Sequence, residues 1–256
     1  MKIYEFGDRS NPVILLLPGT ICHWKSNFGA VIPLLEDSFH VACVSYDGFD
    51  ETEDSVFPDM LTETAKIEDY IQQKHSGHIP AAYGCSLGGS FVGLLIQRGN
   101  IHIDHGILGS SDLDQVDGWK ARVMAGIAAP ILYRILQKGR LPGWMEKISR
   151  KKHPGYYVEK FMSLFTGHGS MAFIKKESIY NQFHSDLVTP LENGIAAPGT
   201  TVYCFYAAKM GEQYLRRYEQ HFKSPVIHRQ DMEHEELLVC HPDEWAALVK
   251  EVCGTS

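Results

Sequence analysis

The chain has 256 residues, of which 44% are hydrophobic and 21% are charged, and its formal net charge is -7 at neutral pH. This balance is typical of a folded globular protein and excludes a disordered or fibrous chain. No apolar run reaches the roughly 18 residues that a membrane span needs, and the N-terminus lacks the apolar core of a secretory signal, so we expect a cytoplasmic protein without a membrane span.

Strand-like and helix-like patterns alternate in the first part of the chain. The order is a strand at 12–17, a helix at 26–36, a strand at 40–46, a helix at 61–74 and a third strand at 79–83. The strand-like runs are continuously apolar, which predicts strands covered on both faces. Strands that alternate with helices predict an α/β protein with a mostly parallel sheet flanked by helices.

The pattern changes after a further strand predicted at 102–109. From 115 to 190 the apolar residues recur at helical spacing, interrupted by Gly and Pro, and no strand of comparable strength is found. Strand patterns resume at 200–206 and 225–228, and a closing helix is predicted at 244–252. We therefore expect a core formed by 1–114 and 191–256, with a helical insertion at 115–190 over one end of the sheet.

The predicted insertion carries an unusual concentration of positive charge. Between residues 120 and 160 there are ten basic and two acidic residues, so this segment is near +8 and the remainder of the chain near -15. A solvated face is the simplest interpretation. The alternatives are attraction of an anionic substrate, a membrane surface or an acidic partner. A nucleic-acid partner is not expected, because the segment has no recognition motif and the whole chain is acidic.

Six cysteines lie far apart in the sequence, with no C-x-x-C pair and no Cys/His spacing that resembles a zinc site. We expect reduced thiols, no metal and no cofactor. Cys85 neighbours the candidate nucleophile described next, but a strand-to-helix turn directs the preceding side chain away from it.

A G-x-S-x-G-G motif at residues 84–89 is the strongest functional signal. It directly follows the predicted strand at 79–83 and leads into an apolar, helix-like segment. In this context glycines 84 and 88 leave room for a sharp strand-to-helix turn, which raises the hydroxyl of Ser86 above the sheet at a helix N-terminus. The motif predicts a serine nucleophile.

A serine nucleophile needs a base, which is normally a histidine held by a carboxylate. Of the 13 histidines in the chain, His234 lies a few residues after the last predicted strand, where chain order places the base. His241 is the competitor, but it precedes Pro242 at the expected start of the last helix, which indicates a capping role. His234 is therefore the predicted general base.

Four segments of the chain together resemble the α/β-hydrolase superfamily. They are Leu17-Pro18-Gly19-Thr20, Tyr46-Asp47-Gly48, the motif at 84–89 and Met232-Glu233-His234. The resemblance implies an α/β-hydrolase fold whose insertion forms a cap over the substrate pocket. It also implies an oxyanion hole formed by the backbone N–H groups of Thr20 and Leu87.

The third member of the triad departs from the superfamily pattern. Family members usually carry an acid after the strand that here ends near Tyr206, and this chain has Met210 at that position. Two replacements are predicted: Asp112, after the preceding strand, and Glu212, two residues beyond Met210. Asp114 or the absence of an acid are further alternatives, and Asp112 also suits a plain turn-capping role.

These features predict a serine hydrolase that cleaves a carboxylic ester or thioester through an acyl-enzyme, with a small-molecule substrate. Acyl transfer to an acceptor other than water would use the same nucleophile. A ligand-binding protein that keeps the fold without catalysis is the alternative from another class, and the missing acid is its main support. Fold alone does not select the chemistry, and the sequence does not indicate the oligomeric state.

Overall fold

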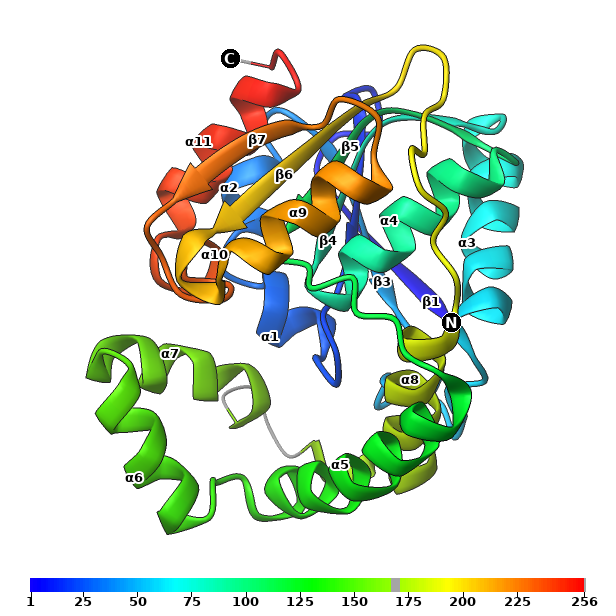
Figure 1. Ribbon diagram of the computed structural model, residues 1–256. Coiled ribbons are helices and arrows are strands. Elements are labelled where there is room, and N and C mark those ends of the chain that lie inside the picture. Colours follow the sequence, from blue (N-terminus) through cyan, green and yellow to red (C-terminus); the bar gives the residue numbers. More distant parts are fainter. Residues whose placement is uncertain (167–170, 256) are drawn as a thin grey trace.

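The computed structural model describes residues 1–166 and 171–255, and a seven-stranded sheet forms its centre (Figure 1). The strands lie in the order β1-β3-β2-β4-β5-β6-β7, with β1 antiparallel to β3 and every other neighbouring pair parallel. This confirms the predicted α/β fold class. The strands are β1 (Lys2–Phe6), β2 (Val13–Leu17), β3 (His40–Ser45), β4 (His78–Cys85), β5 (His102–Gly109), β6 (Thr201–Ala207) and β7 (Val226–Gln230).

Helices cover both faces of the sheet. On one face the core helices are α3 (Met60–His75), α4 (Leu87–Arg98) and α9 (Glu212–His221). On the other face they are α1 (Trp24–Phe28), α2 (Ile32–Leu35), α10 (Glu236–Cys240) and α11 (Pro242–Val252). Each face has its own hydrophobic core, which explains why the central strands are continuously apolar.

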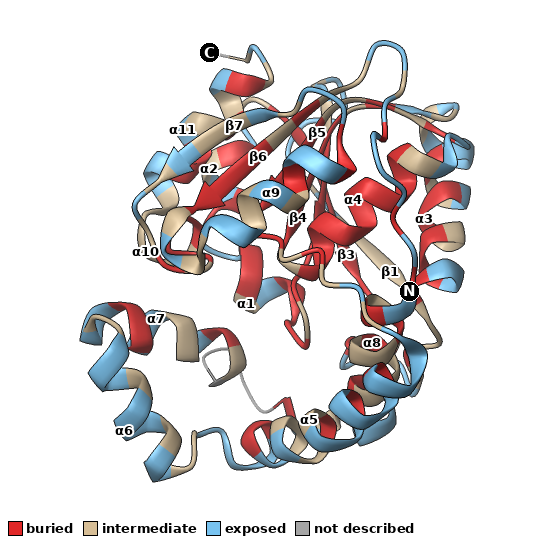
Figure 2. Cartoon of the chain, in the orientation of Figure 1, coloured by how far each residue is buried: buried red, intermediate tan, exposed pale blue. Residues whose placement is uncertain are grey.

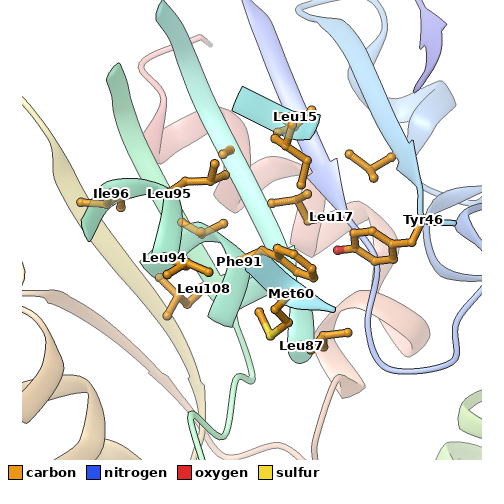
Figure 3. Close-up of a cluster of buried hydrophobic side chains, with 14 of the residues drawn as sticks. Leu15, Leu17, Tyr46, Met60, Leu87, Phe91, Leu94, Leu95, Ile96 and Leu108 are labelled. Carbon is orange, nitrogen blue, oxygen red and sulfur yellow. The ribbon is translucent and has the colours of Figure 1, made fainter. Parts of the chain in front are cut away.

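Strand β2 shows how one apolar run serves both cores. Leu15 and Leu17 point into the core beneath α3 and α4, whereas Ile14 and Leu16 point into the core beneath α1 and α11. Side chains alternate between the two faces of a strand, so a polar residue at any of these positions would be buried. Figure 3 shows Leu15 and Leu17 among the side chains of the first core, beside Phe91 of α4.

Two local features differ from the sequence-based expectation. Strand β1 had not been predicted; it is a short edge strand whose side chains are only partly buried, and its residues lack a long apolar run. The predicted helix at 26–36 is two short helices, α1 and α2. Pro33 lies in the first turn of α2, where its missing N–H costs no hydrogen bond, so it begins a new helix.

The segment between β5 and β6 contains helices joined by irregular loops, and no strand lies in its described part. It contains α5 (Gly118–Lys138), α6 (Gly143–Lys152), α7 (Gly155–Thr166), the 3-10 turn η1 (Met171–Phe173) and α8 (Lys176–Val188). Helix α8 packs along α5, while α6 and α7 lie beyond the end of the sheet (Figure 1). Residues 167–170 of the predicted insertion lie outside the described part. No helix of the described chain is both long and apolar enough to span a bilayer.

Candidate active site

Ser86 lies at the sharp turn between β4 and α4. Its backbone has φ of 49° and ψ of -110°, a conformation that L-residues rarely adopt, and its side chain is partly exposed. The Ser86 N–H donates to the carbonyl oxygen of Gly109 at 2.7 Å, which ties the turn to the end of the neighbouring strand β5. Such strain at a turn beneath a helix N-terminus is the geometry of a nucleophile elbow.

Gly84 and Gly88 of the motif lie too close to neighbouring backbone atoms to carry a side chain. A β-carbon at Gly84 would lie 2.0 Å from the carbonyl oxygen of Gly88, and one at Gly88 would lie 2.1 Å from the carbonyl oxygen of Leu17. Neither contact can be relieved by moving a side chain, because the opposing atoms are backbone. These two glycines therefore allow α4 to begin directly above the ends of β2 and β4.

The loop after β2 brings Thr20 to the same place. A β-carbon on Gly19 would be 3.6 Å from the β-carbon of Ser86, so this loop lies against the elbow. The Gly19 N–H donates to the side chain of Asn27 at 2.8 Å. The Thr20 N–H has no acceptor among the described residues, and Leu87 is the first residue of α4, where the N–H has no partner within the helix. Both predicted oxyanion donors are thus free to bind a ligand.

His234 lies in the loop between β7 and α10. Burial lowers the pKa of His234 to about 4, from an ordinary value of 6.5, so its imidazole is neutral at pH 7 and can accept a proton. The Tyr157 hydroxyl of α7 donates to the His234 carbonyl oxygen at 2.9 Å, and the Phe161 ring meets the imidazole edge to face. In the described structure no hydrogen bond joins His234 to Ser86, a contact that often forms only with substrate bound.

A cavity of about 410 Å³ joins these residues. Ser86, His234 and Thr20 line it from the core, together with Gly19, Ile21, Cys22, Cys85 and Glu235. The rest of its lining is almost entirely apolar and comes from the insertion: Leu132, Ile135, Leu141, Met145, Ser149, Phe161, Met162, Leu164, Phe165 and Phe183. A serine hydroxyl, a neutral imidazole and an apolar wall in one pocket suit attack on a carbonyl attached to an apolar group.

Neither predicted acid contacts His234. The Asp112 carbonyl oxygen accepts from Arg217 at 2.7 Å, and burial raises the pKa of its carboxyl, while Arg217 counteracts this shift. Glu212, with its side chain 56% exposed, pairs with Arg229 at 2.9 Å on the surface. Neither residue lines the cavity, and no described carboxylate pairs with His234.

The turn with Met210 lies next to the histidine loop. It forms the 3-10 turn η2 (Ala208–Met210) after β6, and the Lys209 N–H donates to the Met232 carbonyl oxygen at 3.2 Å. The position where the superfamily usually carries its acid is therefore beside the loop of His234. A methionine there cannot accept a hydrogen bond from an imidazolium as a carboxylate would.

Glu235 is the residue that sequence reasoning missed. Its side chain, on a residue only 2% exposed, accepts from the Ser86 N–H at 3.1 Å and from the Cys85 thiol at 2.9 Å. Its own N–H donates to the Ser110 hydroxyl at 3.1 Å, and its φ is 60°. The only sequence signal was its place after His234, and no spacing rule predicts that its side chain turns back to the elbow.

Burial, more than any other factor, raises the pKa of Glu235 to about 8, although the contacts with Cys85 and Ser86 oppose the shift. Burial likewise holds the pKa of the Cys85 thiol well above its ordinary value. Cys85 therefore carries a protonated thiol that donates to Glu235, although its side chain lines the same cavity as Ser86.

The insertion is anchored to the histidine loop by polar contacts. The His153 imidazole contacts the Glu233 carboxylate at 2.9 Å, and the Tyr156 hydroxyl donates to Glu236. With the bond from Tyr157 to His234, this loop is held by His153, which follows α6, and by two tyrosines in the first turn of α7. A movement of α7 would therefore change the position of His234.

One group of side chains away from the cavity has the composition of a metal site. His78, His102 and Asp104 are the three metal-ligating residues that the described chain brings within 4.8 Å of one another. The two oxygens of Asp104 already contact the imidazoles, at 2.9 Å from His78 and 3.1 Å from His102. These residues lie at the starts of β4 and β5, at the opposite end of the strands from Ser86, so the candidate site does not use them.

Comparison with solved structures identifies the fold. A protein of the alpha/beta hydrolase family from Desulfitobacterium hafniense is similar with a TM-score of 0.78 and 18% identity, over 98% of this chain and 99% of that chain. MenH from S. aureus has a TM-score of 0.69 and 13% identity, over 99% and 98% of the chains. A thermophilic esterase from Thermogutta terrifontis has a TM-score of 0.69 and 16% identity, over 98% and 92%.

The chain therefore has the α/β-hydrolase fold over nearly its whole length, which confirms the fold predicted from the sequence. No protein-family model matches the sequence, and no curated protein matches it. At these identities the likeness is one of fold, so the chemistry has to be argued from the site.

Proposed function

We propose that the protein is a serine hydrolase that cleaves a carboxylic ester or thioester with an apolar acyl group. The observation that carries this proposal is the strained elbow of Ser86, which opens into the same apolar cavity as the neutral imidazole of His234. The esterase with a similar fold supports the reaction class.

In the proposed reaction the Ser86 hydroxyl oxygen attacks the acyl carbon while its proton passes to His234. The negative charge on the former carbonyl oxygen is stabilised by the N–H groups of Thr20 and Leu87, and loss of one such donor typically costs about 10² to 10³ in rate. The leaving alkoxide or thiolate takes the proton from His234. Water then attacks the acyl-enzyme by the same steps and releases the acid.

The orienting acid stays a prediction, with Asp112 and Glu212 as the candidates. Asp112→Asn and Glu212→Gln, compared side by side, test them: the variant that removes a working triad acid is expected to lose about 10⁴ in kcat. The other variant serves as its matched control and keeps the rate. If both keep the rate, neither is the triad acid, and Asp114 or a site without a conventional acid is left.

Labelling by a fluorophosphonate probe tests the nucleophile. We expect a covalent adduct on Ser86 in the folded protein, lost in Ser86→Ala and retained in Ser90→Ala, a buried serine of α4 outside the cavity. Hydrolysis of short-chain and medium-chain p-nitrophenyl esters should be lost with it. An unlabelled protein with no ester hydrolysis would contradict the proposal.

A ligand-binding protein without catalysis is the second candidate, and one observation favours it: no described carboxylate contacts His234. It predicts saturable binding of an apolar ligand in the cavity without turnover, unchanged by Ser86→Ala.

Acyl transfer to an acceptor other than water shares the first half of the proposed reaction, the formation of the acyl-enzyme. Product analysis with an added alcohol or thiol separates it from hydrolysis.

A further inference from the structure

The outer side of the insertion exposes large apolar side chains on two successive helices. On α5 these are Trp119, Val123, Met124, Ile127 and Ile131, and on α6 they are Trp144 and Ile148. Trp119 and Trp144 are 65% and 64% exposed, whereas the other two tryptophans of the chain, Trp24 and Trp245, are 6% and 0% exposed. Exposed clusters of this kind mark interaction surfaces.

The exposed residues of α5 share one face of the helix. Trp119, Val123 and Ile127 follow one another at intervals of four, which places them on one side. The opposite side packs inward through Ala121, Ala125 and Ala129, each fully buried. In Figure 2 the outer surfaces of α5 and α6 are largely pale blue, on the side of the molecule remote from the sheet. The apolar stripe on α5 is therefore not covered by the rest of the described chain.

Positive charges surround these apolar residues. On α6, Lys147 and Lys151 flank Trp144 and Ile148 on the same side of the helix. Lys120 and Arg150 are the basic residues of 120–160 that pair with described acidic groups. The other eight basic residues between 120 and 160 form no ion pair with a described residue: Arg122, Arg134, Lys138, Arg140, Lys147, Lys151, Lys152 and Lys160.

We propose that the outer face of α5 and α6 docks on an anionic lipid surface. Exposed tryptophans and branched apolar residues, flanked by unpaired lysines and arginines, match a bilayer interface, where apolar side chains enter the acyl boundary and basic ones contact anionic headgroups. A folded acidic partner would match the charges, but it would not account for two tryptophans at two-thirds exposure on successive helices.

The placement of the cavity agrees with such docking. Leu132 and Ile135 of α5, and Met145 of α6, line the cavity, while other residues of the same two helices form the exposed face. One pair of helices thus separates the proposed lipid surface from the apolar space in front of Ser86. The docking proposal does not require catalysis by Ser86, so it goes beyond the proposed function.

Vesicle binding tests the proposal directly. The full-length protein is mixed with vesicles of phosphatidylcholine alone, or of phosphatidylcholine with phosphatidylglycerol, and binding is measured by co-sedimentation at low and high salt. We expect binding to the anionic vesicles that weakens with salt, and little binding to the neutral ones. Tryptophan emission should shift to the blue on binding. Trp119→Phe and Trp144→Phe should each reduce this shift, since the other two tryptophans are already buried.

Matched variants separate the two components of binding. Trp119→Ser and Trp144→Ser should each weaken partitioning about tenfold, whereas Leu61→Ser, an exposed leucine of α3, should leave it unchanged. Lys147→Gln and Lys151→Gln should each weaken it about fivefold, with the exposed Lys223→Gln as control. Unchanged melting temperatures would show that these exposed substitutions leave the fold intact.

Ser86→Ala should bind vesicles as the unsubstituted protein does, so a failure of docking and a failure of catalysis are distinguishable. Absence of vesicle binding, or binding that ignores both sets of variants, would overturn the docking proposal. A protein that is dimeric in solution, becomes monomeric with Trp119→Ser and Trp144→Ser, and does not bind vesicles would overturn it too. In that case the face binds a second copy of the chain.

Discussion

His234 is the residue whose titration reports most directly on the candidate site. Burial lowers its pKa to about 4, and no described carboxylate raises it again. Only the neutral imidazole accepts the proton of Ser86, so kcat/KM for a p-nitrophenyl ester should rise with pH through about 4 and be level near pH 7. Stopped assays across this range check the prediction.

The position of that inflection also reports on the triad acid. A carboxylate that faced His234 would favour the imidazolium and raise the pKa. An inflection near or above the ordinary value of 6.5 would therefore show that a carboxylate reaches His234 during catalysis. Glu235→Gln is the control, because Glu235 itself titrates near pH 8 and could add a second inflection.

Glu235 predicts a pH dependence of stability. Its pKa is about 8 in the folded protein against an ordinary 4.5, so between these values the folded state binds more protons than the unfolded state. Its contribution to the free energy of unfolding is thus full below pH 4.5 and falls as the pH rises through 8, by an amount on the order of 5 kcal/mol.

Urea denaturation at several pH values measures this trend. Glu235→Gln removes the titration, so the difference in unfolding free energy between the two proteins should change with pH in the direction given above. The substitution should also weaken the contacts with Ser86 and Cys85, at a cost of about 1–3 kcal/mol. A difference that is constant from pH 5 to 8 would contradict the raised pKa.

At the scale of elements, the turn between β4 and α4 depends on its glycines. Gly84→Ala and Gly88→Ala each place a β-carbon against a backbone carbonyl oxygen, so we expect each to cost about 1–3 kcal/mol or more and to displace Ser86. Gly126→Ala is the matched control: nothing lies within 4 Å of its β-carbon in α5, and it should be neutral or stabilising by about 0.5–1 kcal/mol. Thermal unfolding together with fluorophosphonate labelling rates measures both effects.

The central elements could be predicted from the sequence because their pattern has a single physical cause. Strands buried on both faces must be apolar throughout, and the strand predicted at 102–109 has the same bounds as β5. Strand β1 was missed because an edge strand is only partly buried and leaves no such run. Helix α2 was merged with α1 because the apolar spacing was read across Pro33.

The site could be predicted only in part, for a similar reason. Ser86, Thr20 and His234 lie in motifs fixed by backbone geometry and chain order, and the structure gathers them around one cavity. Glu235 itself has a left-handed backbone conformation, and this directs its side chain to the Ser86 N–H. That conformation depends on tertiary contacts, which the sequence does not reveal. The triad acid could not be predicted, because Met210 removes the only position that local sequence marks for it.

At the scale of the whole molecule, the basic residues of the insertion are separated from the cavity in front of Ser86. The basic residues of 120–160 belong to the insertion, yet no lysine or arginine of the described chain lines the cavity, whose charged or titratable neighbours are His234, Glu235 and thiols. The positive charge can therefore attract an anionic surface or partner without contacting the reacting group of a bound substrate.

This separation predicts which substrates respond to salt. For soluble esters of equal acyl length, the neutral ester should be hydrolysed at least as well as one that carries a carboxylate, because the anion would enter an apolar cavity that no described lysine or arginine lines. The kcat/KM for the neutral ester should change little with ionic strength, whereas vesicle binding should weaken as salt screens the exposed lysines and arginines. Steady-state rates for the two esters at low and high salt provide the measurement. A clear preference for the carboxylated ester, lost at high salt and in Lys147→Gln and Lys151→Gln, would instead show that the basic face steers an anionic substrate to Ser86.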